Sequence, residues 1–384
     1  MKILLIGNLA EDRQESMQRF TALLHSGLSA RGHTVTVLAP TLRLARFGPA
    51  YRYGGLPKYL GYVDKFALFP RQLRRVVGTL RPDIVHVTDH ANAMYASAVT
   101  GLPLLVTCHD LLQIRVARGE VPGQSLGPAG RVYQDWIRTC LARLPHLACV
   151  SDQTRVDLLR LTGLPESRVV VIPNSLNYPY QPVPADAALS RLAALSTRYR
   201  LDPAALAPGR GGFLLHVGGG QWYKNRAGLL AIFAEMRRLV SPPPQLVMVG
   251  PALSVAESHL ATQLGLDGQV CFLGGVSNPE LEALYNLAAG LVLPSWEEGF
   301  GWPIAEAQAC GCPVFTSNRA PMTEVGGRSS VYFDPANSVG AAGIIAAALP
   351  ERSERRDLAR AESHRWQPAL MLDAYEALYR EICP

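Results

Sequence analysis

Several features that would place this 384-residue chain in another class of protein are missing from its sequence. No apolar run approaches the ~18 residues that span a bilayer. The apolar start, residues 3–6, is too short for a signal peptide and is followed by the acids Glu11 and Asp12. The seven cysteines are odd in number and scattered, so they form neither a disulfide framework nor a zinc spacing. We therefore expect a cytoplasmic protein in a reducing compartment, with peripheral contact at the inner membrane face as an open alternative.

The composition is that of a folded protein. Hydrophobic residues make up 48% of the chain and charged residues 18%, a balance typical of globular rather than disordered proteins. At 384 residues the chain is long for one hydrophobic core, so the length favours two domains of ordinary size.

The net charge of +6 is unevenly placed along the chain. Residues 43–75 contain eight Lys or Arg residues and one acid, Asp64. Aromatic residues are interleaved with them: Phe47, Tyr51, Tyr53, Tyr59, Tyr62, Phe66 and Phe69. Such a stretch suits an anionic membrane face or a phosphorylated lipid acceptor. Without a recognised nucleic-acid module we expect no nucleic-acid partner. A solvated basic face whose aromatic rings turn into the core is an equal alternative.

Short apolar runs alternate with helical patterns along the whole chain, which indicates parallel sheets covered on both faces. The runs in the first half are 2–7, 34–39, 83–88, 104–108, 147–150 and 169–172, and those in the second half are 213–217, 245–249, 270–273, 290–293, 314–316 and 331–333. Each series predicts a doubly wound, Rossmann-like α/β domain. The stretch 177–212, rich in Pro and Ala, is expected to connect the two domains and to contain a short helix.

Residues 294–314 carry the most informative motif. Two carboxylates, Glu298 and Glu306, flank the turn Gly299-Phe300-Gly301, and Pro303 stands where a helix is expected to begin. Gly311 falls where a helix of about two turns would end. A glycine loop before a helix start is a place for an anion, most simply a diphosphate.

The motif also assigns roles to its two acids. Glu306 is expected in the first helical turn, where it can accept hydrogen bonds from a diol such as a ribose. Glu298 is expected at the loop entrance, free to contact whatever is attached to the phosphates. An ordinary strand-loop-helix corner with two solvated acids is the simpler alternative.

A second motif follows the apolar run 213–217. The glycines Gly218, Gly219 and Gly220 let the backbone approach a phosphate, and Lys224 near the start of the next helix adds a point charge. Lysines at helix starts are usually solvated, so this motif alone leaves both interpretations open.

The chain resembles the retaining glycosyltransferases of family 4, also called glycosyltransferase group 1, which have the GT-B fold. The resemblance rests on the Glu-(seven residues)-Glu spacing of Glu298 and Glu306. The residues around this spacing also fit, namely Leu281, Tyr285 and Ala288, Pro294-Ser295, Pro313-Val314, Glu324-Val325 and Asp334-Pro335. Matches elsewhere are Arg31-Gly32-His33-Thr34-Val35 and Ile172-Pro173-Asn174.

The resemblance implies two Rossmann-like domains facing a central cleft. It implies an N-terminal acceptor domain (1–176), the connection (177–212) and a C-terminal nucleotide-sugar donor domain (213–365). A last helix (366–384) would cross back to pack on the N-terminal domain after a kink near Trp366-Gln367-Pro368.

The resemblance also implies roles for single residues. Lys224, followed by Asn225, matches the lysine on the donor diphosphate, and the backbone at Phe300 and Gly301 would bind the same group. Many members carry an Arg where this chain has Gly219, and Arg226 is the candidate to compensate. His109 matches a histidine that reaches the donor sugar.

Other polar residues near the ends of the N-terminal strands are of second rank. Asp110 is expected to cap the following turn, and Ser151 to cap a helix. His86, Asp89 and His90 follow another strand and could line the cleft.

Two family features are absent. The loop after the first strand, residues 8–17, lacks the paired glycines of many members, so no acceptor contact is transferred, and the missing Gly-x-Gly-x-x-Gly argues against a nicotinamide-binding domain. No two aspartates stand two residues apart, so the Asp-x-Asp metal clamp of the other large glycosyltransferase fold is absent. No metal and no cofactor beyond the donor substrate are predicted.

The sequence therefore predicts a retaining, metal-independent glycosyltransferase. It would move a sugar from a nucleoside-diphosphate sugar to a hydroxyl of a glycan, glycolipid or small molecule, as in polysaccharide or glycoconjugate biosynthesis. The alternatives are a sugar phosphorylase or nucleotide-sugar epimerase on the same fold, or a non-catalytic nucleotide-binding subunit.

Overall fold

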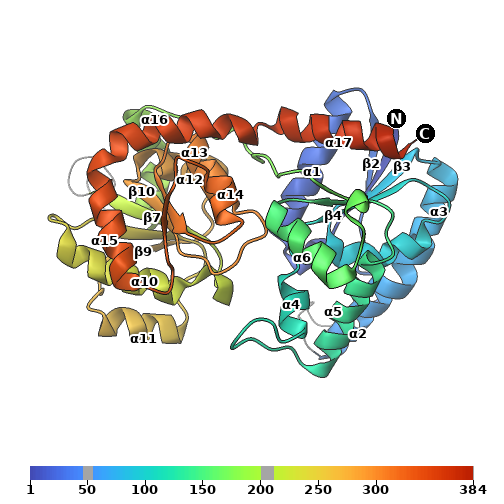
Figure 1. Ribbon diagram of the computed structural model, residues 1–384, viewed down its shortest axis with the longest axis horizontal. Helices are drawn as coiled ribbons and strands as arrows, with labels where there is room; N and C mark the ends of the chain where they lie inside the picture. Colours follow the sequence, from blue (N-terminus) through green and yellow to red (C-terminus); the bar gives the residue numbers. More distant parts are fainter. Residues whose placement is uncertain (46–54, 200–211, 384) are drawn as a thin grey trace. The chain divides into compact units, whose positions relative to one another are not determined.

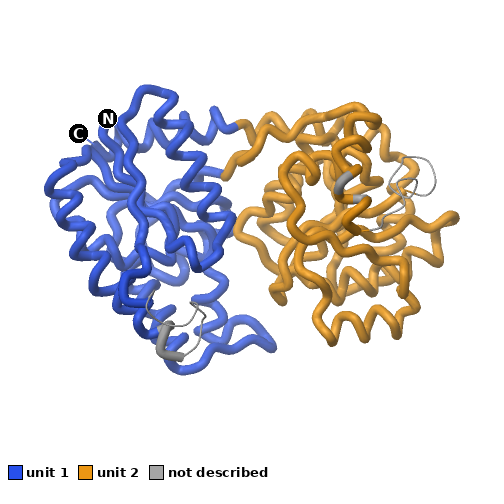
Figure 2. Tube along the Cα trace, turned by 180° about the vertical axis from the view of Figure 1, so that it is seen from behind, with its two compact units in different colours: residues 1–173, 368–384 blue, residues 174–367 orange. Residues whose placement is uncertain are grey.

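The computed structural model describes residues 1–45, 55–199 and 212–383. The chain forms two compact units (Figure 2). Unit 1 comprises Met1–Pro173 together with Pro368–Pro384, and unit 2 comprises Asn174–Gln367. Each unit has its own sheet and its own core.

Unit 1 is built on a six-stranded parallel sheet in the order β2-β1-β3-β4-β5-β6. The strands are β1 (Lys2–Ile6), β2 (Thr34–Leu38), β3 (Ile84–Val87), β4 (Leu104–Cys108), β5 (Leu147–Cys149) and β6 (Val169–Val171). The central strands β3, β4 and β5 are buried along their whole length. This explains their continuous apolar runs, since helices cover both faces of a parallel sheet.

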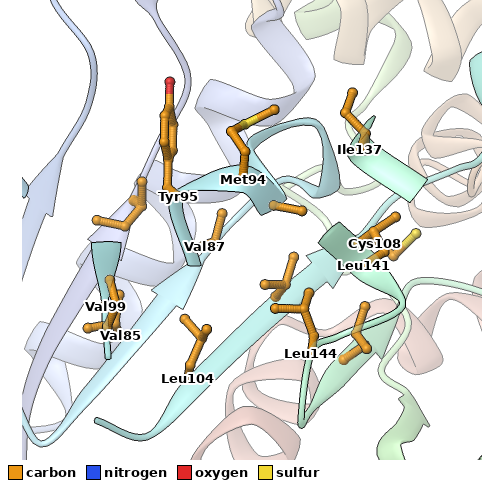
Figure 3. Close-up of a cluster of buried hydrophobic side chains, with 14 of the residues drawn as sticks. Val85, Val87, Met94, Tyr95, Val99, Leu104, Cys108, Ile137, Leu141 and Leu144 are labelled. Carbon is orange, nitrogen blue, oxygen red and sulfur yellow. The ribbon is translucent and has the colours of Figure 1, made fainter. Parts of the chain in front are cut away.

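The helical segments of unit 1 surround this sheet (Figure 1). They are η1 (Ala10–Asp12), α1 (Glu15–Ala30), α2 (Gly55–Val63), the π-helical η3 (Asp64–Leu68), α3 (Phe69–Leu80), η4 (His90–Ala98), α4 (Leu112–Ala117), α5 (Pro128–Leu141), α6 (Asp152–Thr162), η5 (Glu166–Arg168) and α17 (Pro368–Ile382). One face meets η4 and α5 in a core that includes Val85, Val87, Tyr95, Leu104 and Leu141 (Figure 3).

The other face of the unit 1 sheet receives α17, the last helix of the chain. Its Tyr379 hydroxyl lies 2.7 Å from His86 Nδ1, and the Tyr375 hydroxyl lies 3.0 Å from Thr107 Oγ1. Arg31 donates to Asp373 at the rim of this contact. The expected return of the last helix to the N-terminal domain is confirmed. His86, Thr107 and Arg31 find their hydrogen-bond partners on α17.

Unit 2 has a six-stranded parallel sheet in the order β12-β11-β10-β7-β8-β9. The strands are β7 (Phe213–Val217), β8 (Gln245–Val249), β9 (Val270–Leu273), β10 (Gly290–Leu293), β11 (Val314–Ser317) and β12 (Val331–Phe333). The chain runs outward from β7 in one direction and from its neighbour β10 in the other. The boundary between β7 and β10 is therefore the topological switch point of this sheet.

The helical segments of unit 2 surround this sheet (Figure 1). They are α7 (Ala185–Arg191), α8 (Ala193–Tyr199), η6 (Trp222–Lys224), α10 (Arg226–Leu239), α11 (Val255–Gln263), α12 (Asn278–Leu287), α13 (Trp302–Ala309), α14 (Met322–Gly326), α15 (Ser338–Ala348), η7 (Leu349–Glu351), α16 (Arg352–Ser363) and η8 (His364–Trp366). The helices α10 and α15 pack together over one face, with Leu229, Phe233 and Ile345 in the core.

All twelve predicted strands are present, with ends that differ by at most one residue on either side. The expected division of the chain needs correction, however. The chain leaves unit 1 after Pro173 rather than after residue 176, and it returns at Pro368. The stretch predicted as a connection holds two helices, and its α7 packs on α12. Gln181 and Val183 also donate backbone hydrogen bonds to Glu282 and Asn286, so this stretch is part of unit 2.

No helix within residues 1–45, 55–199 and 212–383 combines the length and the apolar character needed to cross a bilayer.

We predict that His86 makes the stability of the protein depend on pH. Burial, together with the nearby His109, lowers the pKa of His86 from 6.5 to about 3. A depressed folded-state pKa means that the unfolded chain binds the proton first, so the free energy of unfolding should fall as the pH falls from about 6.5 towards 3. In His86→Gln the slope should be smaller by up to about 1.4 kcal/mol per pH unit.

Urea unfolding at several pH values measures this slope. His86→Gln also disturbs the bonds to Tyr379 and Thr107, so it should lower stability at every pH. The control is His25→Gln on the exposed side of α1, which should leave the slope unchanged. An equal slope in His86→Gln and the unmodified protein would contradict the prediction.

Candidate functional site

The two motifs found in the sequence meet at the switch point of unit 2. The glycine loop 218–220 follows β7, and the loop that contains Glu298 follows β10. Since β7 and β10 are neighbours in a parallel sheet, their carboxyl ends open on the same edge. The Trp296 N–H donates to the Tyr223 carbonyl at 2.7 Å, which holds the two loops together.

An ion pair between Lys224 and Glu298 joins the same loops. Lys224 Nζ lies 2.7 Å from Glu298 Oε1 and 2.9 Å from Oε2, and the Ser295 hydroxyl donates to Oε1 at 2.8 Å. The side chains are only 13% and 7% exposed. The prediction that Glu298 is free at the loop entrance is therefore wrong for this structure. Its carboxylate is paired because the loop after β7 places the Lys224 ammonium group beside it.

Lys224 belongs to the short η6 segment. The sequence had suggested that it lies in the following helix, and this expectation is wrong. The helix α10 begins at Arg226, and Asn225 stands between them in the left-handed region with φ 53°. The Asn225 side chain accepts from Gly228 N and donates to the Pro294 carbonyl. Its amide is thus used to cap α10 and to hold the second loop, so the structure gives Asn225 a positioning role.

Helix α13 begins one residue earlier than expected, at Trp302, with Pro303 in its second position. Gly301 precedes it at φ 99°, a conformation that only glycine adopts without strain. Gly299 and Phe300 complete the turn, and the buried Phe300 ring packs against Trp302 and Trp366. The N–H groups at the start of this helix and its dipole favour an anion at this point. The predicted end at Gly311 is confirmed, with φ 68°.

Glu306 was predicted in the first helical turn, and this is wrong. It is the fifth residue of α13, it is buried, and the Tyr285 hydroxyl donates to its Oε2 at 2.9 Å. Because the helix starts one residue earlier than expected, Glu306 belongs to its second turn, and it faces α12 there. Burial and the neighbouring Glu306 raise the pKa of Tyr285 well above its usual value, so this phenol stays protonated and remains a donor.

Two further nitrogen-bearing side chains lie beneath the glycine loop. The buried His216 has Nδ1 3.0 Å from the Val292 carbonyl, and burial lowers its pKa to about 4, so the ring is neutral. The Arg226 guanidinium is also buried, with Nε 3.5 Å from Glu257 and Nη2 without a hydrogen-bond partner within the described residues. A Cβ built on Gly220 would lie 3.6 Å from Arg226 Nη1, which places this cation directly against the loop.

Gly250 keeps the glycine loop in place. Its φ of 145° is one that residues with side chains rarely adopt, and a Cβ here would clash with the Gly218 carbonyl oxygen. The Gly218 N–H in turn donates to the Val249 carbonyl at 3.0 Å. The loop after β8 therefore supports the loop after β7, a contact that the sequence motif did not reveal.

The loop before α13 is also anchored to the two ends of unit 2. The Trp302 indole N–H donates to the Ser175 carbonyl at 3.0 Å, and the Phe300 ring centroid lies 5.3 Å from that of Trp366. The Leu176 N–H donates to the Trp366 carbonyl and joins these end segments. Sequence reasoning did not predict these contacts. A signal was present, because large aromatic residues in a glycine turn need a surface to pack on.

In unit 1, His109 follows β4 and is buried. Its Nε2 lies 2.9 Å from the Thr88 carbonyl, and its ring makes an edge contact with Phe20. Burial lowers the pKa of His109, although Asp89 opposes this. The role of His109 towards a donor sugar stays a prediction. Asp110 caps the next helical segment, as expected, by accepting from Leu112 N. Ser151 likewise caps α6.

The second-rank candidates have two different locations in unit 1. His86 is a structural residue of the α17 contact, because its strand position faces that helix rather than the sheet edge. Asp89 and His90 do lie at the edge, where they form an ion pair of 3.2 Å. Burial opposes ionisation of both groups, but their mutual attraction lowers the pKa of Asp89 and raises that of His90.

The loop after β1 contributes to the same polar cluster in unit 1. Asn8 donates to Asp89 Oδ2 at 2.5 Å, and Asn92 donates to Asn8 Oδ1 at 3.0 Å. Since β1 and β3 flank the switch point of this sheet, the cluster is the counterpart in unit 1 of the Lys224–Glu298 site. The sequence did not identify Asn8 or Asn92, because no glycine motif marks them.

No group of three or more His, Cys, Asp or Glu side chains arranged to hold a metal ion occurs within the described parts of the chain. The groups at the switch point of unit 2 instead provide two cations, two carboxylates and a helix start.

We predict that Lys224 and Glu298 are energetically coupled. Removing one partner of a largely buried ion pair leaves an uncompensated charge, so Lys224→Met or Glu298→Gln alone should lower the free energy of unfolding by about 3 kcal/mol. The double variant should lose clearly less than the sum of the two. Arg238 and Glu235, a pair on the surface of α10, are the matched control, with coupling below about 1 kcal/mol. Additive effects of Lys224→Met and Glu298→Gln in urea unfolding would contradict the pairing.

The chain is similar in sequence to known glycosyltransferases. The chain is 28% identical over 240 residues to O-antigen chain mannosyltransferase B of Escherichia coli, and the match spans 60% of each chain. It is 28% identical over 350 residues to D-inositol 3-phosphate glycosyltransferase of Salinispora tropica, covering 82% of this chain and 70% of that protein.

The fold recurs in the crystal structure of Anabaena Alr3699/HepE in complex with UDP and glucose. The TM-score is 0.72 and the identity 16%, and the match covers 99% of this chain and all of the other. Residues 17–178 match the model of glycosyltransferase family 4, and residues 200–365 match that of glycosyl transferases group 1. The chain therefore belongs to the family 4 glycosyltransferases, with a group 1 glycosyl transferase domain in its second half.

Proposed function

We propose that this protein is a retaining glycosyltransferase that moves a sugar from a nucleoside-diphosphate sugar to an acceptor hydroxyl. The observation that carries the proposal is the ion pair between Lys224 and Glu298 at the switch point of unit 2, next to the loop that opens α13. A cation for the phosphates and an acid for sugar hydroxyls are thus held together at the edge where open α/β sheets bind ligands.

The diphosphate would be bound by positive charge from three sources. Lys224 supplies an ammonium group, and the start of α13 supplies N–H groups and a dipole. Arg226 supplies a guanidinium beneath Gly220, which supports the idea that it compensates for Gly219. Preorganised charge of this kind is usually the largest catalytic term when a leaving group becomes negative. With these cations in place the proposed reaction needs no metal ion.

The acids would bind the two ends of the donor. Glu298 would exchange part of its contact with Lys224 for sugar hydroxyls once the diphosphate has bound the ammonium group. Glu306 would accept from the ribose, while the Tyr285 hydroxyl orients its carboxylate. The complex of Anabaena HepE with UDP and glucose supports a nucleotide donor for this fold.

Retention of configuration would follow from attack on the face that the diphosphate leaves. Among the acids at this site, Glu298 is engaged by Lys224 and Ser295, and Glu306 by Tyr285. We assign both acids to hydrogen bonds with the donor rather than to covalent attack, so we favour same-face attack with the leaving diphosphate taking the acceptor proton. We assign to His109 a contact with the donor sugar, for which a neutral ring of lowered pKa is suitable.

The acceptor would be a hydroxyl of a glycan, a glycolipid or a small molecule. The relatives include an O-antigen chain mannosyltransferase and an inositol phosphate glycosyltransferase. Their names support a mannosyl or related hexosyl donor, and either a glycan or a small molecule as the acceptor. A sugar phosphorylase would instead show phosphate-dependent turnover, and an epimerase would isomerise the donor without an acceptor. A non-catalytic subunit would not hydrolyse a nucleotide sugar even slowly.

Nucleotide binding should depend on Glu306. In a thermal-shift screen, the right nucleoside diphosphate should raise the melting temperature, because a ligand that binds only the folded protein stabilises it. Calorimetry with the bare nucleotide should then show roughly tenfold weaker binding to Glu306→Gln, the effect of losing one charged hydrogen-bond acceptor.

Glu354→Ala, an exposed acid on α16, is the control and should bind normally. Thermal unfolding without ligand identifies a Glu306→Gln protein that has failed to fold, and Tyr285→Phe offers a second variant that disturbs the same carboxylate. Unchanged nucleotide affinity in a folded Glu306→Gln protein would remove Glu306 from the site.

Turnover should depend on Lys224. Replacing Lys224 with Ala should reduce the rate of sugar transfer by about two to three orders of magnitude, the usual effect of losing a donor that stabilises developing charge. Arg238→Ala on the surface of α10 should transfer at the normal rate. NMR of the product should show the anomeric configuration of the donor. An inverted product would overturn the retaining mechanism while leaving the transferase itself intact.

A further inference from the structure

Four large hydrophobic side chains of unit 1 are exposed on two of its helices. They are Tyr59 (66% exposed) and Val63 (42%) on α2, and Val132 (72%) and Trp136 (42%) on α5. Each pair is four residues apart, so its members lie on the same side of their helix. We call these four residues the aromatic face. Among the exposed large hydrophobic residues of the described chain, the two aromatic ones, Tyr59 and Trp136, both belong to it.

The two halves of the aromatic face are connected through Phe66 in η3. The Phe66 ring lies 5.2 Å from Trp136 and 5.9 Å from Tyr133, measured between ring centroids, and 5.5 Å from Tyr62. Tyr62 in turn contacts Tyr59 at 6.4 Å. The helices α2 and α5 accordingly appear at the same end of unit 1 in Figure 1. The exposed rings thus stand on a packed aromatic layer, which holds them in position at the surface.

The segment that carries half of this face is strongly basic. From α2 through η3 to α3, the chain has one acid, Asp64, and it is buried, accepting from the backbone N–H groups of Arg43, Leu44 and Ala45. Its charge is therefore turned inward. On α3 the side chains of Arg71, Arg74 and Arg75 are exposed.

Of the other charged residues near the face, Arg131 on α5 is exposed and donates to the Leu126 carbonyl, whereas two more are paired with charged partners. Lys65 donates to Asp12 at 2.6 Å and is not available to a partner. On α5, Asp135 lies next to Trp136 in sequence but accepts from Arg138 at 2.8 Å. Among the described side chains of the segment from α2 to α3, the arginines of α3 are thus the exposed charges.

We propose that the aromatic face and the arginines of α3 dock unit 1 on an anionic lipid bilayer. Trp and Tyr rings are amphipathic and favour the headgroup level of a membrane, while arginines near the surface are attracted by anionic lipids. The valines add exposed apolar area to the face. Of the aromatic residues in the stretch 43–75, Phe47, Tyr51 and Tyr53 lie outside the described residues. Phe69 turns into the core, and Tyr59 turns outward. The docking does not depend on glycosyl transfer, so it can fail while the proposed function stands.

The charge pattern favours a bilayer over a second copy of the chain. A self-complementary interface would bring the three arginines of one copy towards those of the other unless acids faced them, and the run from α2 to α3 offers none at its surface. An anionic bilayer presents negative charge over its whole area, so it satisfies all three.

Co-sedimentation of the full chain with lipid vesicles tests the proposal. The protein should bind vesicles of equal parts phosphatidylcholine and phosphatidylglycerol, and not vesicles of phosphatidylcholine alone. Arg71→Glu, Arg74→Glu and Arg75→Glu combined should weaken binding by roughly a hundredfold or more, since each arginine contributes about 1 kcal/mol. Arg237→Glu and Arg238→Glu on α10 of unit 2 form the control and should bind normally.

Tryptophan fluorescence separates insertion from adsorption by charge. On addition of the anionic vesicles the emission should shift to the blue, and Trp136→Phe should abolish most of this shift while retaining binding. Val132→Ser with Trp136→Ser should weaken binding at least tenfold, whereas Val255→Ser, an exposed valine of unit 2, should not. Equal binding to neutral vesicles, no binding, or a concentration-dependent dimer that Trp136→Ser dissolves would overturn the proposal.

Discussion

The candidate site depends on the contact between the loops that follow β7 and β10. These strands lie far apart in the sequence but are neighbours in the sheet. Their pairing brings Lys224 and Glu298 together. The contact satisfies several groups at once. The ammonium neutralises the carboxylate, the Ser295 hydroxyl holds the same oxygen, and Asn225 ties the second loop to the start of α10. A ligand that arrives here finds charges that are already positioned, so little of its binding energy is needed to order them.

The loop before α13 is restrained just as firmly from its other side. Its Phe300 and Trp302 contact Trp366 and Ser175, which belong to the last and the first segments of unit 2. The two crossings between the units therefore leave from residues that pack on the loop assigned to the diphosphate. Packed aromatic groups have few alternative arrangements, so these contacts restrain the loop and the neighbouring backbone together.

Unit 1 shows how buried polar groups distinguish a structural role from a candidate functional one. His86 uses both ring nitrogens within the protein, one towards Tyr379 and one towards Thr107, and its lowered pKa keeps it neutral in the interface with α17. Asp89 and His90 lie at the sheet edge and form an ion pair there. Three of these polar groups come from a single short stretch, residues 86–90. Their different surroundings follow from the alternation of side chains along a strand and from the turn that ends it.

The sequence alone determined the twelve strands, the two doubly wound domains and the two loop motifs, because hydrophobic periodicity and glycine chemistry are local properties. It also determined that a helix follows the turn Gly299-Phe300-Gly301 and that Asp110 and Ser151 cap their turns. Only the tertiary structure decided that Glu298 is paired with Lys224, that Glu306 lies in the second turn against Tyr285, and that Asn225 ties two loops together. The same holds for the exposure of Trp136 and the burial of Phe69. These outcomes depend on which strands are neighbours and on which face a helix turns inward, and no run of adjacent residues carries that information.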